Sequence, residues 1–141
     1  MRPLVLARLA ATLAVVLLAS GCGGVTAPDL FLVERSGASA HARLTLLVDE
    51  EGGVTCDGTK AASKLSDSQI IKAREIQEEL EKPSAHHLSL PPRAGSVLSY
   101  LVRDEKGTVR FSDNSADQPK VLRKLQLFVL QSAQEVCHLP E

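Results

Sequence analysis

The strongest constraint on the fold of this chain comes from two glycine-containing turns. Each turn lies between apolar segments and is followed by a helical pattern. The turns cover residues 49–53 and 104–107, and the two stretches match at a constant offset of 55 positions. Apolar and polar residues alternate before each turn, and glycine supplies the positive φ that a tight hairpin turn needs. The match reflects either duplication or chance, and in both cases the chain is predicted to contain two strand–strand–helix units.

Both predicted helices carry recognisable boundary signals. Ser66 and Gln69 can form a capping box at the start of the first helix, and Pro83 is predicted to end it. The second helix is predicted over residues 120–137, directly after Pro119, and its wide apolar arc indicates that it is the more buried of the two.

The strands complete a predicted α+β fold. They are expected at residues 30–33, 43–48, 54–56, 97–103 and 109–111. We predict one antiparallel sheet of four to five strands, built from two β-hairpins and covered by two helices in a ββαββα-like order. The second side of this sheet is polar in places, because it carries Arg43, Thr45, Ser99 and Arg110.

The first 21 residues have the pattern of a secretory signal. Arg2 and Arg8 provide a basic start, residues 9–18 are apolar except for Thr12, and three small residues precede Cys22. The apolar stretch is shorter than the about 20 residues that span a bilayer. The cysteine after the small residues resembles a lipobox, in which the thiol is acylated and becomes the first mature residue; an ordinary secretory leader is the alternative. With this leader the chain resembles the small alanine-rich lipoproteins of high-GC Gram-positive bacteria.

The chain is thus predicted to comprise a signal peptide over 1–21, a short tether over 22–29 and a single domain over 30–141. Without the signal, 14 basic residues face 17 acidic ones, which gives a net charge of −3. The sequence shows no basic patch, so nucleic acid is not an expected partner. The tether after Cys22 reaches about 25 Å at most, so we expect the domain to lie close to the extracytoplasmic face of the cell membrane.

The two cysteines that follow Cys22 are predicted to form a disulfide between Cys56 and Cys137. An even number of cysteines in an exported domain favours a bridge. Such a bridge would stabilise the domain by about 4–5 kcal/mol, as an upper estimate from the entropy of the unfolded chain. Free thiols or metal ligands are the alternatives, although the pair lacks the spacing of a metal site.

Catalytic signatures are missing from the sequence, which contains no GxSxG, GxGxxG, P-loop or HExxH pattern. We therefore expect no enzymatic activity and no cofactor. Adjacent His86 and His87 would point to opposite sides of an extended segment, and the acidic turn at residues 49–51 lacks the full EF-hand pattern. We expect no metal site, with a metal at these histidines or a calcium contact at the turn as the alternative.

A small-residue loop is the first candidate for partner contact. Loops carry function more often than cores, and aromatic anchors are few, since tryptophan is absent and the single tyrosine, Tyr100, is expected to face the core. We predict contact at Ser36, Gly37, Ala38 and Ser39. The Pro-rich connection at residues 88–95 is a second candidate.

Several segments between residues 31 and 131 also carry a family resemblance. They are Arg35-Ser36-Gly37 at the end of a strand, the helix opening Leu65-Ser66-Asp67, the Leu90-Pro91 step, the Tyr100 strand, and Gly107 to Asp113 before Pro119. In this layout the chain is similar to the emfourin family of protein inhibitors of thermolysin-like metallopeptidases. Emfourins carry a Gly-Gly-aromatic segment where this chain has residues 36–40, and they lack this lipobox and this cysteine pair. The resemblance implies an α+β fold and a peptidase contact at residues 36–41.

Together these features predict an exported, lipid-anchored lipoprotein that is attached to the membrane through Cys22. We expect it to bind a membrane-proximal protein partner without catalysing a reaction. The emfourin resemblance implies peptidase inhibition as the alternative, and a small-ligand or metal-binding lipoprotein is a third possibility.

Overall fold

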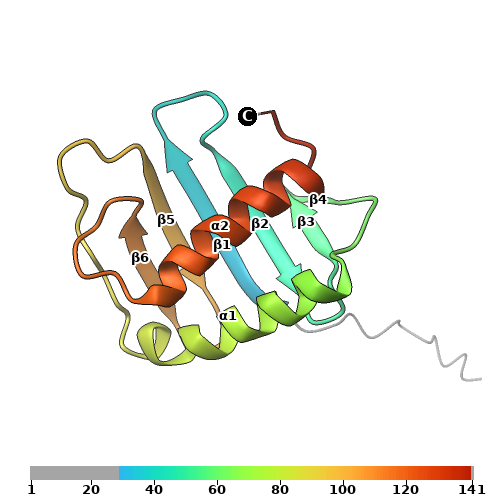
Figure 1. Ribbon diagram of the computed structural model, residues 1–141, viewed down its shortest axis with the longest axis horizontal. Coiled ribbons are helices and arrows are strands. Elements are labelled where there is room, and N and C mark those ends of the chain that lie inside the picture. The colour runs from blue at the N-terminus through green and yellow to red at the C-terminus, as the bar shows by residue number, and fades with distance from the viewer. Residues whose placement is uncertain (1–28, 141) are drawn as a thin grey trace, which may run out of the picture.

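The computed structural model describes residues 29–140, which form a six-stranded antiparallel sheet and two helices (Figure 1). The predicted α+β class is confirmed, with one strand more than the upper number expected. The signal peptide, Cys22 and the tether up to residue 28 lie outside the described residues. In chain order the elements are β1 (Asp29–Gly37), β2 (Leu44–Asp49), β3 (Val54–Cys56), β4 (Thr59–Lys60), α1 (Asp67–Ala85), β5 (Leu98–Arg103), β6 (Thr108–Ser112) and α2 (Lys120–Glu135).

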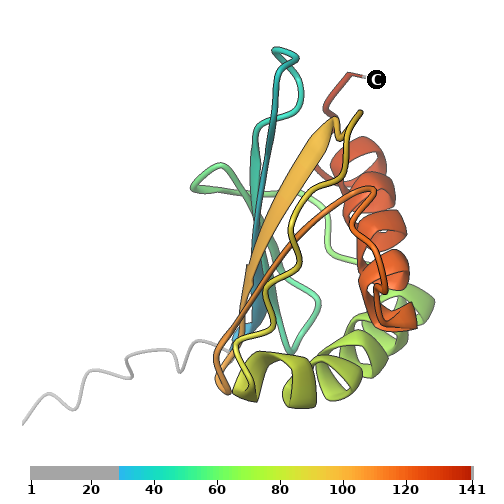
Figure 2. The ribbon, with the colours of Figure 1, turned by 90° about the vertical axis from the view of Figure 1, so that its left-hand side faces the viewer.

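The sheet has the strand order β4-β3-β2-β1-β5-β6, so β1 is central and the two predicted hairpins lie on either side of it. Both helices pack against the same face of the sheet (Figure 2). We call this the helix face and the opposite one the open face, which no helix of residues 29–140 covers.

In each of the two glycine turns, the side chain of the first aspartate accepts hydrogen bonds from backbone amides of the turn. Asp49 Oδ1 accepts from the backbone amides two and four residues later, at 2.9 and 2.7 Å. Asp104 Oδ1 accepts from the amides two and three residues later, at 2.8 and 3.0 Å. Both turns lie at the end of the sheet where β1 begins, because β1 runs antiparallel to β2 and to β5.

Strand β4 was not predicted. Asp57 and Gly58 have φ values of 49° and 82°, and two positive angles in succession are typical of a type I′ hairpin turn. The turn returns the chain so that Thr59 and Lys60 pair with β3. Asp-Gly is the sequence that this turn favours, so the signal for β4 was present in the chain.

Helix α1 begins as predicted but does not end at Pro83. The capping box of Ser66 and Gln69 is present. The helix continues two residues beyond Pro83. Proline can adopt a helical φ, although its ring disfavours the helix interior and it donates no N–H to the preceding turn. The His86 amide then donates to the Lys82 carbonyl at 3.2 Å and closes the last turn. Helix α2 follows Pro119 as predicted and ends two residues before the expected position.

The core lies between the helix face and the two helices. Phe31 of β1 meets Phe128 of α2 edge to face, with ring centroids 5.8 Å apart. Around this pair lie buried aliphatic residues from five strands and both helices, among them Val33, Leu46, Val48, Val54, Val102, Val109, Ile76, Leu80, Leu122 and Leu125. A single apolar core of this extent is typical of a domain that folds independently.

One buried hydroxyl in this core has no hydrogen-bond partner among residues 29–140, that of Ser132 on α2. We expect Ser132→Ala to raise the free energy of unfolding by about 1 kcal/mol, because the unpaired hydroxyl no longer has to be desolvated and alanine favours the helix. Urea unfolding checks this. Ser84→Ala is the matched control and should destabilise by about 1 kcal/mol, since the equally buried Ser84 hydroxyl donates to Asp104 at 2.6 Å. A Ser132→Ala variant no more stable than the parent would contradict the prediction.

Candidate functional site

The predicted contact residues lie together at one end of the molecule. Ser36 and Gly37 end β1, and Ala38 and Ser39 continue into the loop that leads to β2 (Figure 1). All residues over 36–41, which we call the contact loop, are exposed. The nine residues of β1 separate this loop from Asp29 by about 27 Å, so the loop is at the end of the sheet opposite the predicted tether.

A buried arginine holds the contact loop in place. Arg35 is on the helix face and only 9% exposed. Its Nε donates to the Ala42 carbonyl at 2.8 Å, and its Nη2 donates to the His41 carbonyl at 3.1 Å. Arg35 forms no ion pair with a carboxylate among residues 29–140. Because buried charges are normally paired, this uncompensated guanidinium is the most unusual electrostatic feature of the described domain.

Gly37 allows the loop to pack closely against the start of β5. A Cβ atom at this position would lie 2.5 Å from the Val97 carbonyl oxygen and 2.9 Å from the Ala42 Cβ. The first contact is with backbone and cannot be relieved by a side-chain rotation. Any larger residue at position 37 must therefore displace the loop or β5.

A pocket of about 310 Å³ lies beside Arg35, between the contact loop, the start of β5 and the end of α2. We call it the Arg35 pocket. Arg35 lines this pocket, and its Nη1 makes no hydrogen bond to residues 29–140. The other walls are mainly apolar and come from Val97, Leu98, Leu130, Ala133 and Leu139.

Asp113 fixes the β5 side of this pocket. Its carboxylate accepts the Val97 amide at 3.1 and 3.2 Å and the Ser96 hydroxyl at 2.9 Å. Partial burial alone would raise the pKa of Asp113, but these hydrogen bonds outweigh burial and lower the pKa below its usual 3.8. The ionised carboxylate is thus the form that the fold prefers.

This preference predicts how the contribution of Asp113 changes with pH. A carboxyl group with a lowered pKa stabilises the folded state above its unfolded pKa, and this contribution is lost as the pH falls through the folded value. We expect Asp113→Asn to be less stable than the parent at pH 6, with the difference shrinking at pH 3. Urea unfolding of both proteins at the two pH values measures this. A difference that is equal or larger at pH 3 would show that the charge of Asp113 is not what matters.

Tyr100 faces the core, as expected, and is 6% exposed. Its ring stacks on Phe111 with centroids 4.9 Å apart. Burial raises the pKa of Tyr100, the positive charge of Arg35 opposes this, and the charge of Asp113 adds to it. The single tyrosine therefore belongs to the packing beneath the pocket and not to an exposed contact surface.

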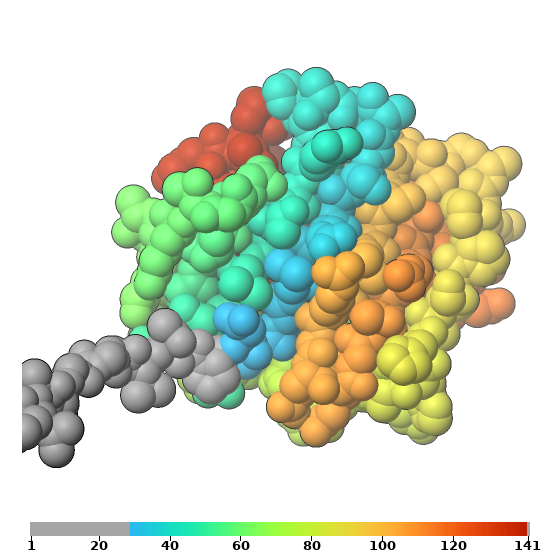
Figure 3. Space-filling model, turned by 180° about the vertical axis from the view of Figure 1, so that it is seen from behind, coloured from blue at the N-terminus to red at the C-terminus, as the bar shows by residue number. Residues whose placement is uncertain are grey.

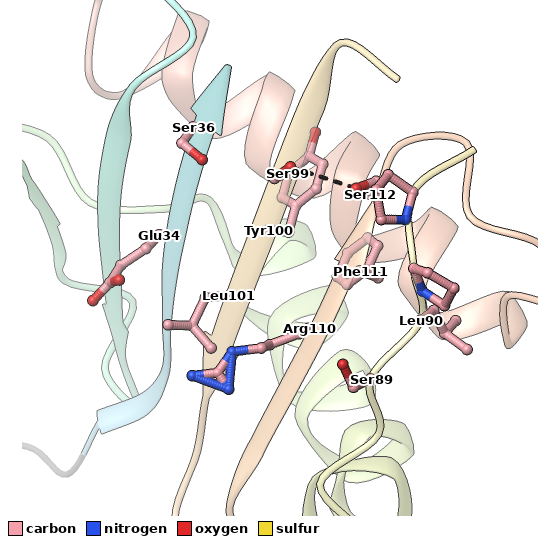
Figure 4. A pocket seen from close by; sticks show the side chains of 12 residues that line it. Glu34, Ser36, Ser89, Leu90, Ser99, Tyr100, Leu101, Arg110, Phe111 and Ser112 are labelled. Carbon is pink, nitrogen blue, oxygen red and sulfur yellow. Dashed lines mark hydrogen bonds between the residues drawn. The ribbon is translucent and has the colours of Figure 1, made fainter. Parts of the chain in front are cut away.

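A second depression lies on the open face (Figures 3 and 4). This groove of about 480 Å³ runs between β1, β5, β6 and residues 89–92. The connection at 88–90 lies beside β6, because Arg110 donates its amide to the Leu88 carbonyl and accepts the Leu90 amide, both at 2.8 Å. The Pro-rich connection that we predicted as a second contact surface therefore forms one border of the groove.

The groove carries several polar side chains but offers no catalytic constellation. Ser99 and Ser112 lie with their hydroxyls 3.4 Å apart, and no histidine lines the groove to activate them. Glu34 is paired with Arg103 at 2.8 Å. The Arg110 side chain extends over β5 towards Leu101 (Figure 4). The arrangement is suited to surface contact.

The remaining predicted sites lie apart from both depressions. Cys56 and Cys137 have their sulfur atoms 1.98 Å apart and their Cα atoms 5.9 Å apart, the geometry of a disulfide between β3 and the chain after α2. His87 Nδ1 lies 3.4 Å from the Thr108 hydroxyl. Within residues 29–140 no three histidine, cysteine or acidic side chains are placed to share a metal ion, and neither helix there is long and apolar enough to cross a membrane.

Sequence reasoning missed Arg35 and Asp113 as site residues. Side chains alternate between the two faces of a strand, so Arg35 lies on the same face of β1 as Phe31 and Val33 and faces the core. The signal in the sequence was an arginine at a position where the alternation predicts an apolar residue. No protein-family model, curated protein or solved structure matches the chain.

Proposed function

We propose that the protein is an exported, lipid-anchored binding protein without enzymatic activity, held at the outer face of the cell membrane through Cys22. Its contact loop at residues 36–41 would bind a membrane-proximal protein. The observation that carries the proposal is the place of this loop: it is exposed, and it lies at the end of β1 opposite Asp29.

The position of the loop limits where the partner can be. The tether reaches about 25 Å and β1 adds about 27 Å, so the loop can act up to about 50 Å from the lipid surface. The partner surface must lie within that distance. A membrane protein with an extracytoplasmic domain, or a protein bound to one, meets this condition.

The loop is also held in one conformation, which favours binding. Arg35 donates to the carbonyl of His41 in the loop and to that of Ala42 directly after it, and the Ala42 amide donates to the Ser39 carbonyl at 3.2 Å. A rigid loop loses less conformational entropy when it binds than a mobile one does. Small residues in this setting suit close contact of the backbone with a partner.

Site-specific photocrosslinking tests the proposal. A photoreactive residue is placed at Ala38 in the full chain in its native host, with Glu75, exposed on α1, as the matched control position. We expect one protein to be crosslinked from position 38 and not from position 75. The purified protein should then bind the parent domain saturably and bind Gly37→Val at least tenfold more weakly. Equal crosslinking from both positions, or no loss of affinity in Gly37→Val, would contradict the proposal.

Peptidase inhibition is a second candidate, because the exposed loop coincides with the segment implied by the emfourin resemblance. The test is the inhibition of a thermolysin-like metallopeptidase by purified, oxidised residues 23–141, with a small peptide substrate. Stoichiometric inhibition that is lost in Gly37→Val would support this function. The absence of inhibition at micromolar concentrations of the protein would rule out peptidase inhibition.

A further inference from the structure

We propose that the Arg35 pocket binds a small aliphatic carboxylate. The carboxylate would pair with the accessible edge of the Arg35 guanidinium, and the hydrocarbon chain would lie along Leu98, Leu130 and Ala133. This inference does not rest on the proposed protein partner, because the pocket is formed by this chain alone.

The charge of Arg35 favours an anionic ligand. Arg35 is nine-tenths buried, carries a guanidinium group, and has no carboxylate partner among residues 29–140. Two carbonyl groups accept from Nε and Nη2 but do not neutralise the charge. The Nη1 edge is left without a protein acceptor within the described domain. An anion with two oxygen atoms is the ligand that a guanidinium edge pairs with best.

The lining of the pocket favours a ligand with an apolar part. Val97 and Leu130, which flank it, are 61% and 46% exposed, and they are two of the four large apolar residues that are exposed among residues 29–140. Apolar residues placed around one buried charge fit a ligand that is charged at one end and apolar along its length. Phosphate or sulfate alone would leave these walls in water.

The size of the pocket favours a ligand of medium length. At about 310 Å³ the pocket is at the lower end of the range of about 300–1,000 Å³ for small-molecule sites. A medium-chain carboxylate is of the right order, whereas a long-chain fatty acid would extend beyond the walls. Octanoate is the probe that matches both the charge and the length.

The test is binding of octanoate to purified residues 23–141, followed by amide chemical shifts. Octanol and octylamine, which have the same chain without a negative charge, are the ligand controls. We expect saturable shifts centred on Ala42, Leu98 and Ala133 with octanoate, and at least tenfold weaker binding of the two controls. Octanol binding as tightly as octanoate, or no shifts at millimolar octanoate, would overturn the proposal.

Two substitutions on one helix separate the pocket from general surface binding. Leu130→Glu places a carboxylate at the mouth of the pocket, while Leu127→Glu places it at a position that is 50% exposed and does not line the pocket. Both positions are exposed enough to keep the fold. We expect Leu130→Glu to weaken octanoate binding at least tenfold and Leu127→Glu to leave it unchanged. Equal effects of the two variants would overturn the site.

Arg35→Gln should also abolish binding, with Arg110→Gln on the open face as its control. Because Arg35 also holds the contact loop, the loop amide shifts of unliganded Arg35→Gln are compared with those of the parent.

Pro140 lines the pocket, and the next residue in the sequence, Glu141, lies outside the described residues. The octanoate titration is therefore repeated in Glu141→Gln. Octanoate shifts at the same amides in that background support the proposal, and their absence would contradict it.

Discussion

Replacing Cys56 and Cys137 together by serine is expected to lower the free energy of unfolding by about 4 kcal/mol and the melting temperature by about 15 °C. The two sulfur atoms close a loop between positions 81 apart in the sequence, and closing a long loop removes much of the freedom of the unfolded chain. Thermal unfolding of oxidised residues 23–141, followed by circular dichroism, measures the change.

Reduction provides the control for this prediction. A reducing agent should lower the melting temperature of the parent to that of the double variant and leave the variant itself unchanged. A double variant that melts within about 3 °C of the oxidised parent would show that the bridge adds little to stability. Equal sensitivity of both proteins to the reductant would point to an effect unrelated to the bridge.

The bridge also acts on the candidate site. It ties the segment after α2 to β3, and the Leu139 amide in that segment donates to the Ala133 carbonyl at 2.9 Å. Both residues line the Arg35 pocket. The pocket therefore depends on the C-terminal segment staying against α2, and we expect the serine double variant to bind octanoate more weakly even under conditions where it remains folded.

Local chemistry explains which parts of the fold could be predicted from the sequence. The Ser66 capping box and the two glycine turns are each specified by residues a few positions apart, and the structure shows them as expected. Pro83 was misread because proline disfavours the interior of a helix but is compatible with its last turn. Strand β4 was missed because it contains only two residues after the Asp57-Gly58 turn.

The candidate site was harder to predict because it depends on contacts between distant segments. The composition of residues 36–40 predicted a loop, although the first two of them end β1, whereas the Arg35 pocket is formed by β1, β5 and α2 together. The alternation of side chains along β1 places Arg35 on the helix face. It cannot show whether a carboxylate from another segment will lie beside the Arg35 guanidinium. The polar residues on the second side of the sheet, Thr45 and Arg110 among them, did indicate a face that the helices leave open.

Phe128→Ala is expected to lower the free energy of unfolding by about 3–5 kcal/mol, the cost of removing a large aromatic side chain from a packed core. Phe128 is 1% exposed and meets Phe31 edge to face, so it joins α2 to the central strand. The surrounding strands are paired on both sides and cannot collapse easily into the space left behind. Urea unfolding of residues 23–141 provides the measurement.

The adjacent residue on the same helix is the matched control. Leu127 is 50% exposed, and Leu127→Ala should change the free energy of unfolding by no more than about 0.5 kcal/mol. The two substitutions remove apolar side chains from neighbouring positions, so a large difference between them can come only from burial against the sheet. If Leu127→Ala lowered the free energy of unfolding as much as Phe128→Ala, α2 would have to be rotated about its own axis relative to this structure. The same rotation would move Leu130 away from Arg35, so this pair of variants also tests whether the pocket walls are where the structure places them.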